Sequence, residues 1–140
     1  AMKASTVFDC SMISLPINHQ ANGNLTAVSN GIQVPFDVKR VYYLYDVPGG
    51  FSRGGHGHLE LQQLILALSG SFDITVDDGK VKRTFHLSRP NMGLFMPSGL
   101  WRELDNFSSG SICFVLASIE YDEKDYFRDY DKFVAWKSSK

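Results

Sequence analysis

The sequence lacks a charge excess of either sign: 14 lysines and arginines stand against 15 aspartates and glutamates, a formal net charge of −1. Because nucleic-acid and membrane surfaces attract basic proteins, we expect neither as a partner. The chain has no apolar run near the roughly 20 residues that a membrane helix needs. Its first residues also lack the apolar core of a signal peptide. We therefore expect a cytoplasmic protein.

Cysteine is scarce as well, with only Cys10 and Cys113, which are far apart and have apolar neighbours. A disulfide between them is compatible with the sequence, but two buried free thiols suit a cytoplasmic protein better. The chain has 140 residues, 44% of them hydrophobic, which is enough to bury one core. We expect a single domain over residues 1–140.

Short segments rich in β-branched and aromatic residues alternate with turn signals along most of the chain. The predicted strands are 25–28, 38–47, 61–68, 71–76, 81–87, 93–96, 100–104 and 111–118. Residues 18–24 are predicted as a turn, with Asn22-Gly23 its strongest signal. Many short strands at this spacing predict an antiparallel sandwich or barrel.

The tail has a different period. Over residues 122–136, aromatic side chains recur at intervals of three and four, which predicts one or two short amphipathic helices packed on the body. The aspartates and lysines between these aromatic residues are expected on a solvated face.

Two of the four histidines, His56 and His58, lie two residues apart beside a strand-like segment. Alternate residues of an extended backbone point to the same face, so both imidazoles can enter one cavity. The glycines around them leave room for a close approach to the backbone. The interval from Gly50 through this pair and Gln63 to Gly70 resembles the first cupin motif, with Gln63 in place of the usual glutamate.

A second interval resembles the end of the second cupin motif. Pro97-x-Gly99, Arg102 and Asn106 keep its spacing, with Arg102 in place of the usual histidine, while Asn91 replaces the leading glycine. The resemblance implies an all-β fold, a cupin-type antiparallel jelly-roll barrel, to which the tail adds a short C-terminal helical segment.

Both departures fall on positions where a metal-binding cupin has ligands. Gln63 is a neutral amide, and Arg102 is a permanent cation that would repel a metal ion. The two remaining imidazoles are a poor set for zinc or iron, which favour three or four protein ligands. We therefore expect no metal and no cofactor, and two histidines that are free to move protons.

A narrower resemblance covers residues 8–136. The segments PFDVKRVYYLYDVPGG, RGGHGH, LSGSFDITVDDG, WRELDNFSSGSICFVLAS and YDEKDYFRDYDKF are similar to those of nucleotide-sugar 3,4-ketoisomerases. That family acts on dTDP-4-keto-6-deoxy-D-glucose on the way to 3-amino sugars of lipopolysaccharide or S-layer glycans. The resemblance implies an isomerase that moves a ketone from C4 to C3 through an enediolate.

The resemblance also implies catalytic roles. The family's histidine pair falls on His56 and His58, with His56 as the base, and its strand tyrosine falls on Tyr42, which would relay a proton between the hydroxyl and ketone oxygens. A histidine can accept and return a proton at neutral pH without a metal. Arg102 would face the sugar and stabilise the developing enediolate. Packing is the alternative role for Tyr42, as it is one of three tyrosines in its strand.

Three further residues are candidates for substrate binding. Arg53 would bind the diphosphate, since a guanidinium binds phosphate in bidentate fashion and glycines follow it; the alternative is a solvated loop charge. Gln63 would position a hydroxyl or His58. The family divides by configuration at C4, and the resemblance places that difference at Asn22 and Arg102. Arg102 favours the gluco product, Asn22 fits neither pattern, and Leu59 stands where members often carry lysine.

The family forms homodimers with exchanged N-terminal strands, and residues 6–13 suit such an exchange. The expected ligand is a dTDP-linked 4-keto-6-deoxyhexose. Two alternatives stay open. A nucleotide-sugar 3,5-epimerase also uses a cupin with a histidine base, and a cupin without activity could bind a sugar nucleotide. Exchange of the H5 proton, or tight dTDP binding without turnover, would distinguish them.

Overall fold

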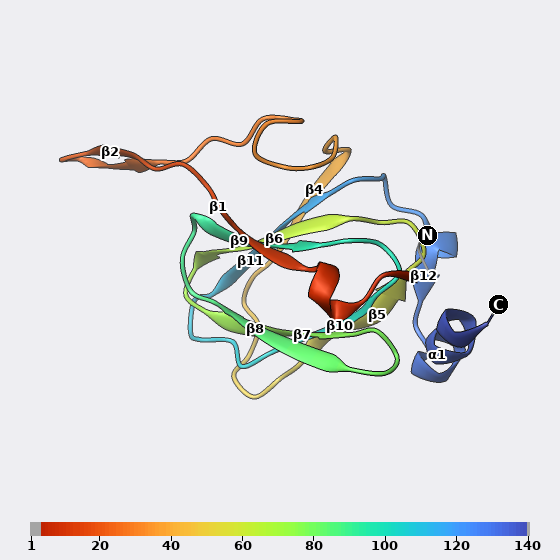
Figure 1. The fold of residues 1–140 in the computed structure, drawn as a ribbon. Helices are drawn as coiled ribbons and strands as arrows, with labels where there is room; N and C mark the ends of the chain where they lie inside the picture. The colour runs from red at the N-terminus through yellow and green to blue at the C-terminus, as the bar shows by residue number, and fades with distance from the viewer. Residues whose placement is uncertain (1–3, 140) are drawn as a thin grey trace.

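The strands of the protein form two facing antiparallel sheets, closed at one end by the C-terminal segment (Figure 1). The structure is a computed structural model that describes residues 4–139. The elements are η2 Val7–Asp9, β1 Ser11–Ser14, β2 Asn18–Gln20, β3 Gly23–Leu25, β4 Arg40–Leu44, β5 Arg53–His58, β6 Gln63–Ser69, β7 Phe72–Asp77, β8 Lys82–Leu87, β9 Met92–Met96, β10 Trp101–Asp105, β11 Ile112–Ala117, η3 Glu123–Asp125, β12 Tyr126–Phe127 and α1 Tyr130–Ser138.

One sheet has the order β1-β9-β6-β11-β4 and the other β12-β5-β10-β7-β8. The hairpin β2-β3 projects away from both (Figure 1). This arrangement confirms the predicted all-β barrel with one short C-terminal helix. Within residues 4–139, no helix is both long and apolar enough to cross a membrane.

The apolar run of β6 is continuous because both faces of this central strand are covered. Ile65 and Ala67 enter the core between the sheets, whereas Leu64 and Leu66 point outward into a second cluster. The loop after β3 covers that second cluster with Val28 and neighbouring apolar residues. Leu64 and Leu66 are thus buried almost as completely as Ile65 and Ala67, and only toward the end of the strand does an outward side chain, Leu68, become exposed.

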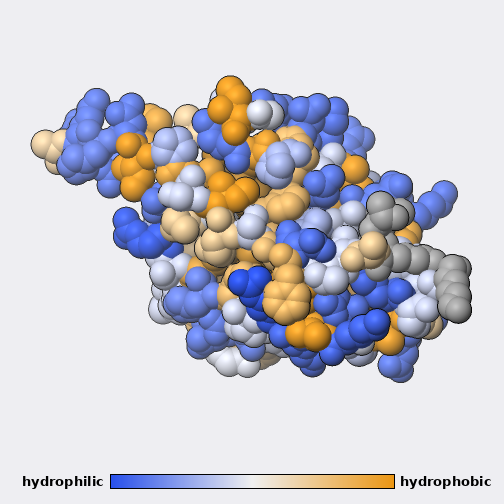
Figure 2. Space-filling model, in the orientation of Figure 1, coloured by the Kyte–Doolittle hydropathy of each residue, from blue (hydrophilic) through white to orange (hydrophobic). Residues whose placement is uncertain are grey.

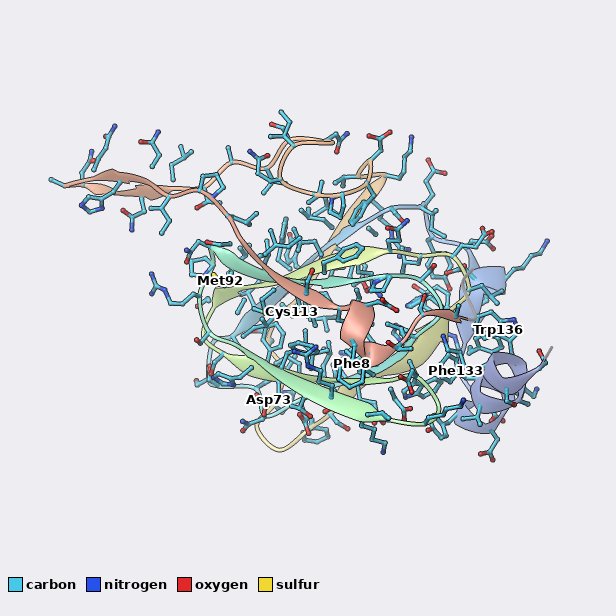
Figure 3. All side chains as sticks on the ribbon, in the orientation of Figure 1. Phe8, Asp73, Met92, Cys113, Phe133 and Trp136 are labelled. Carbon is cyan, nitrogen blue, oxygen red and sulfur yellow. The ribbon has the colours of Figure 1, made fainter. Side chains whose placement is uncertain are left out.

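Both cysteines are free and buried, as predicted. Cys113 lies between the two sheets (Figure 3). Burial raises the pKa of Cys10 to about 12 and that of Cys113 to about 11, so neither thiol supplies a thiolate at neutral pH.

Several segments differ from the prediction, and the strands β1 and β5 lie outside the predicted strand ranges. Residues 18–24 form most of a hairpin rather than a turn alone, and residues 26–28, predicted as strand, continue as loop beyond the end of β3. In the tail, only α1 is an α-helix of the kind predicted, because Tyr126 and Phe127 form a strand that pairs with β5. The open edge of β5 offers backbone hydrogen bonds that outweigh the helical spacing of the aromatic side chains.

The helix α1 covers the outer face of β5 and β10. Asp129 caps its N-terminus by accepting hydrogen bonds from two backbone N–H groups. Phe133 is fully buried and lies between α1 and the barrel, 5.8 Å from the Trp101 ring (Figure 3). Because Trp101 faces the helix, the alternation of β10 turns Arg102 to the inside of the barrel.

Gly57 provides the space into which Phe133 packs. A Cβ atom at Gly57 would lie 2.9 Å from Phe133 Cδ1 and 3.3 Å from Trp101 Cε3. We predict that Gly57→Ala lowers the free energy of unfolding by about 1–3 kcal/mol, as overpacking typically does. The matched control is Gly55→Ala on the same strand, whose added Cβ meets nothing closer than 3.6 Å. Urea unfolding of both variants would test this, and equal losses would contradict it.

Candidate active site

The two histidines and Arg102 share the inner face of one sheet. His56 lies directly opposite Arg102 in the register of β5 and β10. The His56 and His58 rings are edge to face, with centroids 4.8 Å apart, as their spacing predicts. His58 is 1% exposed and Arg102 is 2% exposed, so a permanent charge is buried beside two imidazoles.

The facing sheet contributes Tyr42 from β4 and Gln63 from β6. The Tyr42 hydroxyl accepts a hydrogen bond from Arg102 Nη2 at 2.9 Å and donates one to Gln63 Oε1 at 3.2 Å. Gln63 thus accepts a hydrogen bond from the Tyr42 hydroxyl, and its predicted role in substrate binding stays a prediction. This chain of hydrogen bonds joins the two sheets across the barrel interior, from Arg102 on one sheet to Tyr42 and Gln63 on the other.

Several buried polar atoms of this group have no hydrogen-bond partner among the described residues. They are His56 Nε2, His58 Nε2, Arg102 Nε and Arg102 Nη1. Leaving such groups unsatisfied typically costs about 1–3 kcal/mol each, more for charged groups. A polar ligand that offers donors and acceptors would satisfy them, so this cluster is the candidate active site.

The surroundings keep both imidazoles neutral. Burial, followed by the Arg102 charge and the neighbouring His58, lowers the pKa of His56 to about 2. Burial also lowers the pKa of His58 to about 4, against the effect of its hydrogen bond to Asp125. Burial raises the pKa of Tyr42 although Arg102 acts to lower it. At neutral pH the site thus combines two neutral bases, a protonated phenol and a fixed cation.

The tail forms a wall of the site that the sequence pattern did not indicate. The Tyr126 ring lies 5.1 Å from His56 and 4.6 Å from His58, between centroids. Asp125, expected on a solvated face, is 5% exposed, and its Oδ2 atom lies 3.3 Å from His58 Nδ1. The sequence does contain one signal for the short strand β12: the adjacent aromatic residues Tyr126 and Phe127, which precede the helix cap Asp129.

At the edge of the site, Tyr126 contacts further side chains on the side that faces solvent. The Arg128 guanidinium carbon lies 4.6 Å from the Tyr126 ring centroid. Arg128 pairs with Glu123 at 2.7 Å, and the Tyr121 hydroxyl also contacts Glu123. The sequence assigned no role to these residues.

Two predicted substrate-binding residues lie outside the cluster. Arg53 is exposed at the first position of β5. Asn22 is exposed in the turn of the hairpin β2-β3, which extends away from the barrel (Figure 1). Leu59, where family members often carry lysine, is half-buried just after His58. Among residues 4–139, no three His, Cys, Asp or Glu side chains are grouped so that they could hold a metal ion.

Comparison with known proteins identifies the family. The family model described as "FdtA: WxcM-like, C-terminal" matches residues 8–138. The chain belongs to this family. A curated relative, the TDP-4-oxo-6-deoxy-alpha-D-glucose-3,4-oxoisomerase of Aneurinibacillus thermoaerophilus, is 41% identical over 113 residues, 81% of each chain. The predicted resemblance to 3,4-ketoisomerases is thereby confirmed.

Solved structures agree with this assignment. A 3,4-ketoisomerase from Helicobacter canadensis has a TM-score of 0.91 and 40% identity, covering 94% of this chain and 98% of its own. The WlaRB TDP-quinovose 3,4-ketoisomerase from Campylobacter jejuni has a TM-score of 0.88 and 41% identity, covering 92% and 99%.

The lowered pKa of His58 makes stability depend on pH. Between pH 6.5 and about 4 the unfolded chain binds a proton at this histidine and the folded protein does not, so stability falls as the pH falls through that window. We predict that His58 accounts for roughly 2 kcal/mol of the stability lost between pH 7.5 and 5.

Urea unfolding at both pH values would check this. His58→Asn should reduce the loss, whereas His19→Asn, in the exposed hairpin, should leave it unchanged. Equal losses in wild type and His58→Asn would contradict the assignment.

Proposed function

We propose that the protein is a dTDP-sugar 3,4-ketoisomerase, which converts dTDP-4-keto-6-deoxy-D-glucose into its 3-keto isomer. The observation that carries the proposal is the buried cluster of two neutral imidazoles and one guanidinium, whose polar atoms include several with no hydrogen-bond partner in residues 4–139. Membership of the family and the names of the relatives support the substrate class.

In the proposed reaction, His56 removes the proton from C3 and an enediolate forms across C3 and C4. A base works by offering a lone pair, and His56 is neutral, with an Nε2 atom that no described residue contacts by a hydrogen bond. The same imidazole, now protonated, returns a proton to C4. The net change moves one hydrogen from C3 to C4 and one between the two oxygens, so no electrons are gained or lost.

Arg102 and Tyr42 serve the oxygen atoms in this mechanism. The guanidinium is fixed and buried, so it can stabilise the negative charge of the enediolate with little reorganisation. Tyr42 stays protonated and is held by Arg102 and Gln63, which suits it to relay a proton between the two oxygens. Arg53, exposed at the end of β5, is proposed to contact the diphosphate.

The proposal includes a homodimer in which N-terminal strands are exchanged. The hairpin β2-β3 projects from the barrel, and Leu25 on it is 60% exposed. Figure 2 shows apolar side chains beside this hairpin and on the barrel face below it. A second copy would cover them, and Asn22 would then approach the site of that copy. The two free cysteines agree with the proposed cytoplasmic location.

The gluco configuration at C4 is the proposed outcome. Arg102 matches the gluco pattern of the family, and the relative from Campylobacter jejuni is named for TDP-quinovose, a gluco-configured sugar. Asn22 matches neither pattern and does not contribute to this proposal.

We predict that the wild-type protein converts dTDP-4-keto-6-deoxyglucose into the 3-keto isomer and exchanges the C3 proton in deuterated buffer. His56→Asn should reduce both by at least about 100-fold, the usual contribution of a general base. His86→Asn is the control, because His86 is exposed and pairs with Asp73. NMR of the product reports reaction and C4 configuration together, and undiminished exchange in His56→Asn would contradict the role of His56.

The same NMR experiment separates the alternatives. An epimerase would also exchange the proton on C5, whereas the proposed isomerase would not. A binding protein would retain dTDP without any exchange at carbon.

The proposed exchange of N-terminal strands between subunits yields a further prediction. If Asn22 acts in the partner's site, mixing Asn22→Ala and His56→Asn subunits creates heterodimers with one complete site. We expect the mixture to recover about a quarter of wild-type activity, since half the dimers are mixed and each has one working site of two. Heterodimers are formed by refolding or co-expressing the two variants together. The control is a simple mixture of the two purified variants, in which the subunits have not been exchanged. Activity no higher than the sum of the separate variants would show that Asn22 does not act across the dimer.

A further inference from the structure

Asp125 lies at the junction of η3 and β12 and is 5% exposed. Its three oxygen atoms hold the segment that follows His58. The backbone carbonyl accepts from Leu59 N at 2.9 Å, Oδ1 accepts from Glu60 N at 2.7 Å, and Oδ2 accepts from Leu61 N at 3.3 Å. The carboxylate is therefore fixed against the β5–β6 connection, in a position set by backbone groups.

The position of Oδ2 determines which nitrogen of His58 carries the proton. Oδ2 lies 3.3 Å from His58 Nδ1 and already accepts from the Leu61 N–H, so this oxygen faces the ring as a hydrogen-bond acceptor. Nδ1 is therefore the donor. A neutral imidazole has one ring proton, so Nε2 carries the lone pair. Burial and Arg102 lower the pKa of His58 to about 4, and the ring stays neutral at pH 7.

The other side of the ring faces the reaction site. His58 Nε2 is buried without a hydrogen-bond partner among the described residues, beside His56 and Arg102. In the opposite tautomer, His58 would place an Nε2–H donor beside Nε and Nη1 of Arg102, two donors that also find no acceptor among the described residues. The neighbouring residue Tyr126 lies edge-on to the His58 ring and limits its rotation. One short segment of the tail thus fixes both the proton and the orientation of His58.

We propose that Asp125 is a positioning residue, which holds His58 as the Nδ1–H tautomer and presents Nε2 as the acceptor for a hydroxyl group of the sugar. The assignment of the sugar rests on the proposed function, whereas the tautomer does not. His56 and His58 then have different roles, because His56 is the base at carbon and His58 accepts a hydrogen bond from oxygen.

The test is Asp125→Asn, because an asparagine that keeps Oδ1 on the Glu60 N–H turns its NH₂ group toward His58 Nδ1, where Oδ2 stands in the wild type. We expect Nδ1 to become the acceptor and the ring proton to move to Nε2. ¹⁵N NMR of protein labelled in histidine distinguishes pyrrole-type from pyridine-type ring nitrogens, and His58→Asn assigns the signals. We also expect kcat for the dTDP-sugar to fall about tenfold or more, since a reversed tautomer disables a catalytic histidine, with a smaller change in KM.

The matched control is Asp122→Asn, which alters the exposed cap of η3 without touching His58. It should change neither the tautomer nor kcat. If Asp125→Asn fails to fold, the wild-type spectrum alone decides, because a proton on His58 Nε2 there would overturn the proposal. A reversed tautomer in Asp125→Asn with unchanged kcat would overturn the catalytic role. If the wild type showed the Nδ1–H tautomer but never turned over a dTDP-sugar, the proposed function would fail while the tautomer assignment stood.

Discussion

The candidate site depends on the pairing of β5 with β10 on one edge and with β12 on the other. In this register Arg102 is opposite His56, and Tyr126 is opposite His58, so all four point into the barrel. The next row, formed by Trp101, Gly57 and Phe127, points outward, where α1 covers it. A shift by one residue would exchange the two rows and put the imidazoles under the helix. Packing of α1 on the outer row therefore fixes the register on which the inner row depends.

Burying the charged and polar side chains of the inner row costs free energy, and the packing of the outer row under α1 must offset that cost. A buried guanidinium without a paired carboxylate is unfavourable, and Arg102 contacts only the neutral Tyr42 hydroxyl in the hydrogen bonds of the described residues. That same charge, together with burial, suppresses protonation of both histidines. The site is thus prepared for a ligand that becomes negatively charged, because such a charge would offset the cost of burying the guanidinium.

Spacing along the chain was enough to predict the inner row where the chemistry is local. His56 and His58 share a face because they are two apart on a strand, and the resemblance to the cupin motifs pointed to Gln63 and Arg102 as their neighbours. Asp125 and Tyr126 were missed because their aromatic neighbours follow a helical period, while the structure uses them as a strand edge. Such pairing depends on which strand edge is free, a property of the whole sheet that no local pattern contains.

Asp125 and Tyr126, which the sequence pattern did not place in the site, contribute both to the fold and to the chemistry of the site. Asp125 holds the β5–β6 connection through three backbone N–H groups and touches the His58 ring with the same carboxylate. Tyr126 completes a sheet and packs on both imidazoles. Because these contacts are made by residues joined in sequence, partial detachment of β12 from β5 would release the orientation of His58 and expose the histidines together. The neutral state of the two imidazoles, which relies on burial, is therefore coupled to the docking of the C-terminal segment, and loosening that edge should raise the pKa of the histidines before it unfolds the barrel.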